Sequence, residues 1–363
     1  MTPAELSRTV LRSVRGAVEE QELSVPVPAR IVVQPPPRPG CGDYASNVAL
    51  QLAGPAGRPA REVAEILRKR LVGSAGIARV EIAGPGFLNF TLGDGALIAL
   101  VRDVLAQGDG YGGTRAGQGP GAFGPVDGSA AADARQAVVD EVLARIDAVA
   151  GTGGCRGGGH SALAPVPYDL ATLTARLGSD EARWVLLRPA AHDPVRVPER
   201  PVQRESNPRF RVQYAYARVR ALVRNAGELG FVSEPGDVGR PLTGGGSSSS
   251  PEDRSAPTAQ PTPQQPTPPA QSLQSLQALQ TLLATFPSVI EAAARLRAPD
   301  RVVRHLEATA DAFFRWHDLF PPLPVGEQKP LAVHRARLAL AEAGGTVLAN
   351  GLRLLGISAP EHL

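Results

Sequence analysis

The stretch 207–230, NPRFRVQYAYARVRALVRNAGELG, decides how the second half of this chain folds. Its apolar residues recur at the spacing of one helix face, which is therefore expected to pack into a helical core: Val212, Ala215, Val219 and Leu222. The remaining surface carries arginines with tyrosines between them: Arg209, Arg211, Tyr214, Tyr216, Arg218, Arg220 and Arg224. Guanidinium groups bind phosphates, and tyrosine rings offer faces on which RNA bases stack. The pattern predicts a helix that is half core and half polyanion surface. An ordinary amphipathic helix with a solvated basic face is the alternative.

This stretch resembles the first helix of the anticodon-binding domain of arginyl-tRNA synthetases, where an Asn-Pro start leads into Gln-Tyr-Ala-x-Ala-Arg. Helical periodicity returns further along, at 272–286, 288–296, 301–320 and 330–355. The last of these, with its ending LGISAPEHL, is similar to the C-terminal helices of the same family and their Leu-Gly-x-Ser-Ala-Pro-Glu close. The segment 170–187 resembles the end of the family's catalytic core. The resemblance implies an all-α, DALR-type anticodon-binding helical bundle over 169–363.

The first hundred residues mix short helices with short strands, which predicts a small α+β domain. The expected elements are a helix over 4–20, a strand over 30–35, a helix over 44–52 capped by Asp43, a helix from Pro59 to Gly73, and a strand pair over 77–92. The motifs CGDYASNVALQLA, PAREVAEIL and VEIAGPGFLNFTL occur in the order of the N-terminal domain peculiar to arginyl-tRNA synthetases. The resemblance implies that this α+β domain covers 1–105.

A candidate base-reading pair lies in the expected strand pair. Gly84 and Gly86 let the backbone bend around Pro85, and Phe87 and Asn89 then share one face of a strand. An aromatic ring beside an amide suits the recognition of one unstacked base. In the family this strand meets the D-loop at the tRNA elbow, so the resemblance implies an RNA contact. The alternative is a core phenylalanine beside a turn-satisfying amide.

Side-chain chemistry and the resemblance to arginyl-tRNA synthetases together indicate eight candidate RNA-binding residues: Phe87, Asn89, Arg211, Gln213, Tyr214, Arg218, Trp316 and His317. For Arg218 the alternative is an internal ion pair that holds the helix, and Trp-His-Asp at a helix end also fits packing and capping. The chain ends Pro-Glu-His-Leu, whereas the family commonly ends Pro-Glu-Arg-Met. Trp316-His317 stands where the family has a tyrosine. Both departures weaken the case for the same anticodon preference.

The middle of the chain departs from the family. The segment 106–168 is a predicted Gly-rich linker with one helix, over 132–150. The segment 234–270 is low in complexity and almost without apolar side chains, so it cannot offset the chain entropy lost on folding. We expect it to be a disordered insert within the helical domain.

The chemistry of arginine activation is not found in the sequence. A class I synthetase needs a nucleotide-binding sheet, a His-x-Gly-His-type turn and a lysine-bearing loop for the charge of its transition state. GGGH at 157–160 places His160 in a Gly-rich loop with no strand before it, and the only lysines, Lys69 and Lys329, belong to or precede helices. The six histidines lack metal-ligand spacing. We therefore expect no complete nucleotide-binding Rossmann core, no catalytic residue, no cofactor and no metal.

Charge, cysteine content and the length of apolar runs indicate where the protein is located and which partners it has. Its formal net charge is +3, and its two cysteines, Cys41 and Cys155, lie too far apart in sequence to suggest a disulfide framework or a metal set. No apolar run is long enough to span a membrane, and the first residues lack the apolar core of a signal peptide. A cytoplasmic location without a membrane partner is expected.

The predicted function is that of a non-catalytic arginyl-tRNA synthetase paralogue that binds tRNA through elbow and anticodon modules. One alternative is a protein-interaction scaffold whose RNA binding has decayed, which would make a protein the partner. The other is a subunit that supports arginyl-tRNA aminoacylation in trans. A continuous positive stripe from Asn89 to Arg218 would favour RNA over the scaffold, because salt-dependent affinity scales with the number of neutralised phosphates.

Overall fold

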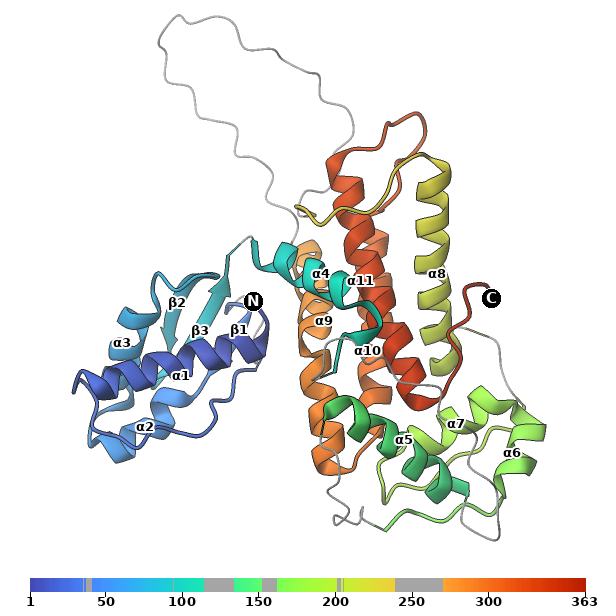
Figure 1. Cartoon of the computed structure of the whole chain (residues 1–363), viewed down its shortest axis with the longest axis horizontal. Coiled ribbons are helices and arrows are strands. Elements are labelled where there is room, and N and C mark those ends of the chain that lie inside the picture. Colours follow the sequence, from blue (N-terminus) through green and yellow to red (C-terminus); the bar gives the residue numbers. More distant parts are fainter. Residues whose placement is uncertain are drawn as a thin grey trace, which may run out of the picture.

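The structure, a computed structural model, describes residues 1–34, 36, 41–93, 95–113, 134–151, 162–200, 204, 206–238 and 270–363. An N-terminal α/β region lies beside a larger helical domain (Figure 1). The elements of the α/β region are α1 (Pro3–Glu19), β1 (Tyr44–Ser46), α2 (Val48–Ala56), α3 (Ala60–Leu71), β2 (Ile77–Ala83) and β3 (Phe87–Leu92). Those of the helical domain are α4 (Gly95–Gln107), η1 (Gly108–Gly110), α5 (Ala134–Ala150), α6 (Leu170–Leu177), α7 (Ser179–Leu187), α8 (Pro208–Glu228), α9 (Ala270–Leu296), α10 (Asp300–Leu319) and α11 (Ala332–Leu355).

The N-terminal region is a three-stranded antiparallel sheet, in the order β1-β3-β2, packed against helices. Its core gathers the apolar faces of α1 and α3 with the inward residues of the central strand, including Leu6, Val10, Val63, Leu88 and Phe90. The strand pair expected over 77–92 is confirmed as the β2–β3 hairpin. Its turn comes so close to α3 that a Cβ on Gly86 would lie 2.9 Å from the Ala60 carbonyl oxygen, so only glycine fits there.

The single helix expected over 44–52 is wrong. Residues 44–46 form β1 instead and pair with β3, and the helix that follows is α2. The open edge of β3 offers these residues backbone partners that a helix start cannot match. Asp43 does not cap a helix: its carboxylate accepts a 2.7 Å hydrogen bond from the Leu92 amide. The strand expected over 30–35 is reduced to one bridge, between Gln34 and Ala45.

The helical domain is built around α8, α10 and α11. Contacts from Arg211 to Asp311 and from Tyr214 to Phe314 show that α8 and α10 run in the same direction. Helix α11 returns between them, and a Cβ on its Gly345 would lie 2.8 Å from a Val219 methyl group, so glycine lets the two helices approach closely. The two helices expected over 272–286 and 288–296 are one continuous helix, α9, with Pro287 inside it.

Residues from the predicted linker contribute to the core of the helical domain. Helix α5 buries Val138, Val142 and Ile146 in the cluster that continues through α8–α11. Arg135, at its start, is 1% exposed and donates to main-chain carbonyls after α7, including those of Pro189 (2.9 Å) and Ala191 (3.0 Å). These bonds give the buried guanidinium main-chain acceptors. The extents of the linker and the domains stay predictions.

Polar contacts hold the N-terminal region and the residues that follow it against α9 and α11. Gln277 of α9 donates a 3.3 Å hydrogen bond to Asp43. Asn350 of α11 donates to the carbonyls of Gly108 (2.9 Å) and Tyr111 (3.1 Å), and the Tyr111 hydroxyl donates to Leu283 O at 2.9 Å. Figure 1 shows the sheet region beside α9, with α4 lying against α11. The chain therefore enters the helical domain directly after the sheet region.

Part of the expected insert is packed. Between residues 234 and 238, Glu234 N donates to Arg335 O at 3.2 Å, and Val238 is 2% exposed. The remainder, 239–269, lies outside the described residues. Across the described ranges, no helix has both the length and the apolar character needed to cross a bilayer.

Candidate RNA-binding surface

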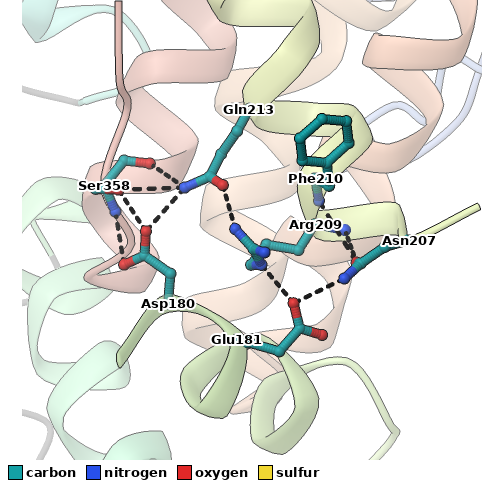
Figure 2. A network of polar contacts seen from close by, with 7 residues as sticks. All are labelled: Asp180, Glu181, Asn207, Arg209, Phe210, Gln213 and Ser358. Atoms are coloured by element: carbon teal, nitrogen blue, oxygen red, sulfur yellow. Dashed lines mark hydrogen bonds and ion pairs between the residues drawn. The ribbon is translucent and has the colours of Figure 1, made fainter. Parts of the chain in front are cut away.

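A buried polar network surrounds the start of α8 (Figure 2). Asn207 caps α8, because its Oδ1 accepts a 3.0 Å hydrogen bond from Arg209 N, and its Nδ2 donates to Glu181 Oε2 at 2.8 Å. The same carboxylate pairs with the Arg209 guanidinium. Glu181 is 5% and Arg209 is 9% exposed, so each charge depends on the other. Arg209, expected on the polyanion surface, is therefore an internal structural residue.

Gln213 connects this network to the C-terminal segment. It is 2% exposed, and its Nε2 donates to Asp180 Oδ2 (2.8 Å) and Ser358 O (2.9 Å). Its Oε1 accepts from Arg209, while Ser358 N donates to Asp180 Oδ1 at 3.1 Å. Figure 2 shows the amide between Arg209 on one side and Asp180 with Ser358 on the other. Both ends of this amide are occupied, so it holds α7, α8 and the C-terminal segment together.

The aromatic residues of α8 and α10 form a stack along their interface. Tyr214 lies between Phe210, at 6.0 Å between ring centroids, and Phe314, at 5.5 Å. The Arg211 guanidinium lies 5.0 Å from the Phe314 ring, and its Nε is 2.6 Å from Asp311 Oδ1. Tyr214 and Arg211 are half-buried, so each keeps part of its surface for a partner.

Trp316 and His317 differ in accessibility. Trp316 is fully buried and packs against Phe320, whereas the His317 side chain is 17% exposed. Burial lowers the pKa of His317 below its ordinary value, and the nearby charge of Arg218 lowers it further, while Asp318 acts in the opposite direction. The imidazole is thus held towards its neutral form, in which it both donates and accepts hydrogen bonds.

Arg218 is exposed, and in the described part of the chain it has no ion pair. The internal pairing considered for Arg218 is instead made by Arg209, which begins the same helix. Arg218 is therefore the α8 arginine best placed to meet an external phosphate. It lies beside His317, whose titration it influences.

The other basic residues of α8 face the C-terminal tail. Arg220 Nε lies 3.1 Å from Glu361 Oε1, and Arg224 contacts the Glu361 carbonyl (3.4 Å) and His362 Nδ1 (3.3 Å). The sequence shows that His362 departs from the family ending, but the ion pair made by Glu361 was not anticipated. It joins residues far apart in the chain, and no local pattern signals it.

The two residues of the candidate elbow pair both belong to β3, the central strand of the sheet: Phe87 begins the strand and Asn89 lies further along it. Phe87 is 41% exposed at the start of β3, so it is not a core residue. Asn89 is 8% exposed and lies between Ala45 of β1 and Glu81 of β2. An external ring could therefore stack on Phe87, while Asn89 is largely covered by its neighbours.

The structure does not gather all the nominated side chains into one site. Arg211, Tyr214, Arg218 and His317 cluster on the α8–α10 face, whereas Phe87 and Asn89 belong to the separate sheet region. Gln213 and Trp316 are buried within the helical domain. Within the described ranges, no group of three or more histidine, cysteine or acidic residues is placed to share a metal ion.

Comparison with known families agrees with this two-part layout. The model of the arginyl tRNA synthetase N terminal domain matches residues 8–92, and the model of the DALR anticodon binding domain matches residues 254–363. The first therefore covers the sheet region and the second the C-terminal helices.

Similar curated proteins are named arginine–tRNA ligases. The one from Frankia alni is 45% identical over 157 residues, which are 42% of this chain and 28% of the relative. The one from Paenarthrobacter aurescens is 36% identical over 197 residues, which are 54% of this chain and 30% of the relative. These matches thus span less than a third of either relative. A third, from Renibacterium salmoninarum, is 26% identical over 579 aligned positions that cover all of both chains. Because this chain has 363 residues, that alignment contains long gaps on its side.

A solved structure shares the fold. Thermus thermophilus arginyl-tRNA synthetase superposes with a TM-score of 0.54 at 13% identity, with all of both chains covered. The solved structure shows the shared fold, while the two matched domains, N-terminal and DALR anticodon-binding, and the curated relatives identify the chain as an arginyl-tRNA synthetase-related protein.

Proposed function

We propose that this chain is a non-catalytic paralogue of arginyl-tRNA synthetase that binds tRNA through its elbow and anticodon modules. The observation that carries the proposal is the junction by which the residues directly after the sheet region attach to α9 and α11. Asn350 holds the Gly108 carbonyl at 2.9 Å, and the Tyr111 hydroxyl reaches Leu283 O at 2.9 Å, soon after the sheet region ends. This junction occupies the place in the chain where a catalytic domain would begin.

The elements between the two modules support the same conclusion. From the end of α4 to the start of α8, the described elements are η1, α5, α6 and α7, all of them helical. A nucleotide-binding domain for arginine activation needs a parallel sheet. The sequence of this part also lacks the lysine-bearing loop that would stabilise transition-state charge. Loss of arginine activation is therefore the expected state of the chain, and tRNA is the expected partner.

The RNA-binding part of the proposal rests on Arg218, Tyr214 and His317 in the anticodon module and on Phe87 in the elbow module. Arg218 supplies an exposed charge, and Phe87 supplies an exposed ring. Guanidinium groups and aromatic rings are the side chains that recognise unpaired RNA. A cytoplasmic location follows from a tRNA partner and belongs to the same proposal.

One observation favours the scaffold alternative. Arg209, Arg211 and Arg220 each pair with an acid of the same chain, and Arg224 faces the C-terminal tail. Arginines that already pair with acids of the same chain neutralise fewer RNA phosphates. This lowers both the affinity for RNA and its dependence on salt concentration. Direct tRNA binding separates the two functions: a Kd for tRNA well below that for a random RNA duplex supports the paralogue, and equal values support the scaffold.

A further inference from the structure

A groove lies beside the start of α8, formed by α7 and the segment that follows it, by residues 206–208 and by α10. Its volume is about 840 Å³, which is within the size range of binding sites for small molecules. The residues that matter for its chemistry are Trp184, Arg188, Arg196, Arg200, Pro208 and Arg304. None of them is among the RNA-binding candidates drawn from the sequence.

Of the three acids that the described residues place on the groove, Glu181 and Glu307 are paired with arginines, whereas the exposed Asp193 lies 3.7 Å from His192 Nε2. Glu181 is bound by Arg209 and Asn207, and Glu307 lies 2.7 Å from Arg188 Nε. Arg304, by contrast, pairs with Asp300, at 2.8 Å. These pairs account for most of the charge on the groove walls.

Arg196 and Arg200 carry the uncommitted charge. Both line the groove, both are exposed, and within the described ranges neither makes an ion pair or a hydrogen bond. Against the single described groove carboxylate that lacks an arginine partner, that of Asp193, these two guanidinium groups leave the groove with a net positive charge. Two guanidinium groups without internal acids are available for an external anion.

The groove also has apolar lining residues. Prolines line it, among them Pro194, Pro198 and Pro208, together with Trp184. Trp184 is 2% exposed, and its indole N–H has no acceptor in the described part of the chain. A buried donor without a partner costs free energy, and Trp184 is the lining residue that carries one.

We propose that this groove holds an unpaired nucleotide segment of a bound RNA, an inference that rests on the proposed function. Arg196 and Arg200 contact its phosphates, and a splayed base lies over the proline surface near Trp184. A peptide segment of acidic residues alone would match the charge but would leave the apolar surface uncovered, and a peptide that also carries apolar side chains is the alternative that the test below separates. The groove also opens where α8 begins, and Arg218 lies about 15 Å further along the same helix at 1.5 Å per residue. One strand of RNA would then contact both places.

The test compares full-length wild type with two double variants. Arg196→Gln/Arg200→Gln removes the uncommitted charge of the groove. Arg102→Gln/Arg295→Gln removes the same charge from exposed positions on α4 and α9 that do not line it. The affinity for a tRNA transcript is measured across a salt series. The groove variant should flatten the slope of log K against log salt by about 1.4, which is 0.7 for each single-strand phosphate, and the control variant should not.

A second measurement reports occupancy of the groove. Trp316→Phe leaves Trp184 as the remaining tryptophan, since the chain has two. Adding a single-stranded oligoribonucleotide should shift the Trp184 emission, and Arg196→Gln/Arg200→Gln should abolish that shift. A shift with polyglutamate but none with the oligonucleotide overturns the proposal in favour of an acidic protein partner.

The outcomes separate the groove from the proposed function. If tRNA binds tightly and the groove variant keeps both its affinity and its salt slope, the groove proposal falls and the proposed function stands. If wild type shows no preference for tRNA over a random duplex, both fall. Circular dichroism melts of every variant confirm that the fold is retained.

Discussion

Gln213 and Ser358 are joined directly, with the amide Nε2 of one 2.9 Å from the main-chain oxygen of the other. Through this bond α8 holds the segment that follows α11, the last helix of the chain. Asp180 completes the connection from α7. Buried amide and carboxylate groups thus position α8, which carries Arg218, relative to the C-terminal segment.

Replacing Gln213 with alanine should lower the free energy of unfolding by about 1–3 kcal/mol, because Asp180 and Arg209 would each lose a buried hydrogen-bond partner. Denaturant unfolding measures the change. Gln51→Ala, at an exposed position on α2, is the matched control and should be close to neutral. Equal stability of the two variants would contradict the structural role of Gln213.

Glu181→Ala should destabilise the protein more strongly, by about 3–5 kcal/mol, since it leaves the buried guanidinium of Arg209 without its counter-charge. The control is Glu62→Ala, an exposed acid in the first turn of α3. A double variant that also carries Arg209→Met should recover much of the loss. If it does not, the Glu181–Arg209 pair is not the cause.

Phe87→Ala should weaken tRNA binding by about 1–3 kcal/mol with little change in salt dependence, because a stacked ring contributes without releasing counterions. Val72→Ala, which truncates another exposed apolar side chain of the same region, should leave binding unchanged. Filter binding across a salt series gives both quantities. A similar loss in the two variants would remove Phe87 from the RNA surface.

Arg218→Gln should reduce the slope of log K against log salt by about one unit and leave thermal stability unchanged, as expected for an exposed phosphate contact. The comparison is Arg211→Gln, which breaks the 2.6 Å contact with Asp311 and should lower stability as well. A drop in the melting temperature of Arg218→Gln would instead assign Arg218 to the fold.

Stability should fall as the pH is lowered through the range in which His305 titrates. Burial lowers the pKa of His305 to about 4, whereas an unfolded histidine has a pKa near 6.5. Between these values the unfolded chain binds more protons than the folded one, so stability is present at neutral pH and is lost towards pH 4. The total effect is on the order of 3 kcal/mol. His305→Phe should flatten the pH dependence of unfolding between pH 7 and pH 5, and parallel curves would contradict this assignment.

Local patterns predicted much of this fold. The alternation in 77–92 predicts the hairpin, and the periodicity of 207–230 predicts α8, because both depend on residues close together in sequence. The short strand β1 was missed because its partner, β3, lies far along the chain and provides the pairing edge. Helix α5 was predicted as a helix within a linker. Its packing into the core of the helical domain depends on residues far along the chain, which local periodicity does not reveal.

Less of the candidate site could be predicted, because it also depends on contacts between residues far apart in sequence. Arginines at surface spacing on α8 look alike in sequence, yet Arg209 faces Glu181, Arg220 faces Glu361, and Arg218 remains exposed. Their acids come from α7 and the C-terminal tail, so helical spacing alone could not separate paired arginines from available ones.

The central claim, that this chain binds tRNA without activating arginine, is tested most directly by arginine-dependent exchange of pyrophosphate into ATP in the presence of tRNA. The assay uses preparations whose tRNA binding has been measured. We expect exchange no greater than that of a blank without protein. Exchange above that blank, persisting after contaminating host synthetase has been removed, would contradict it.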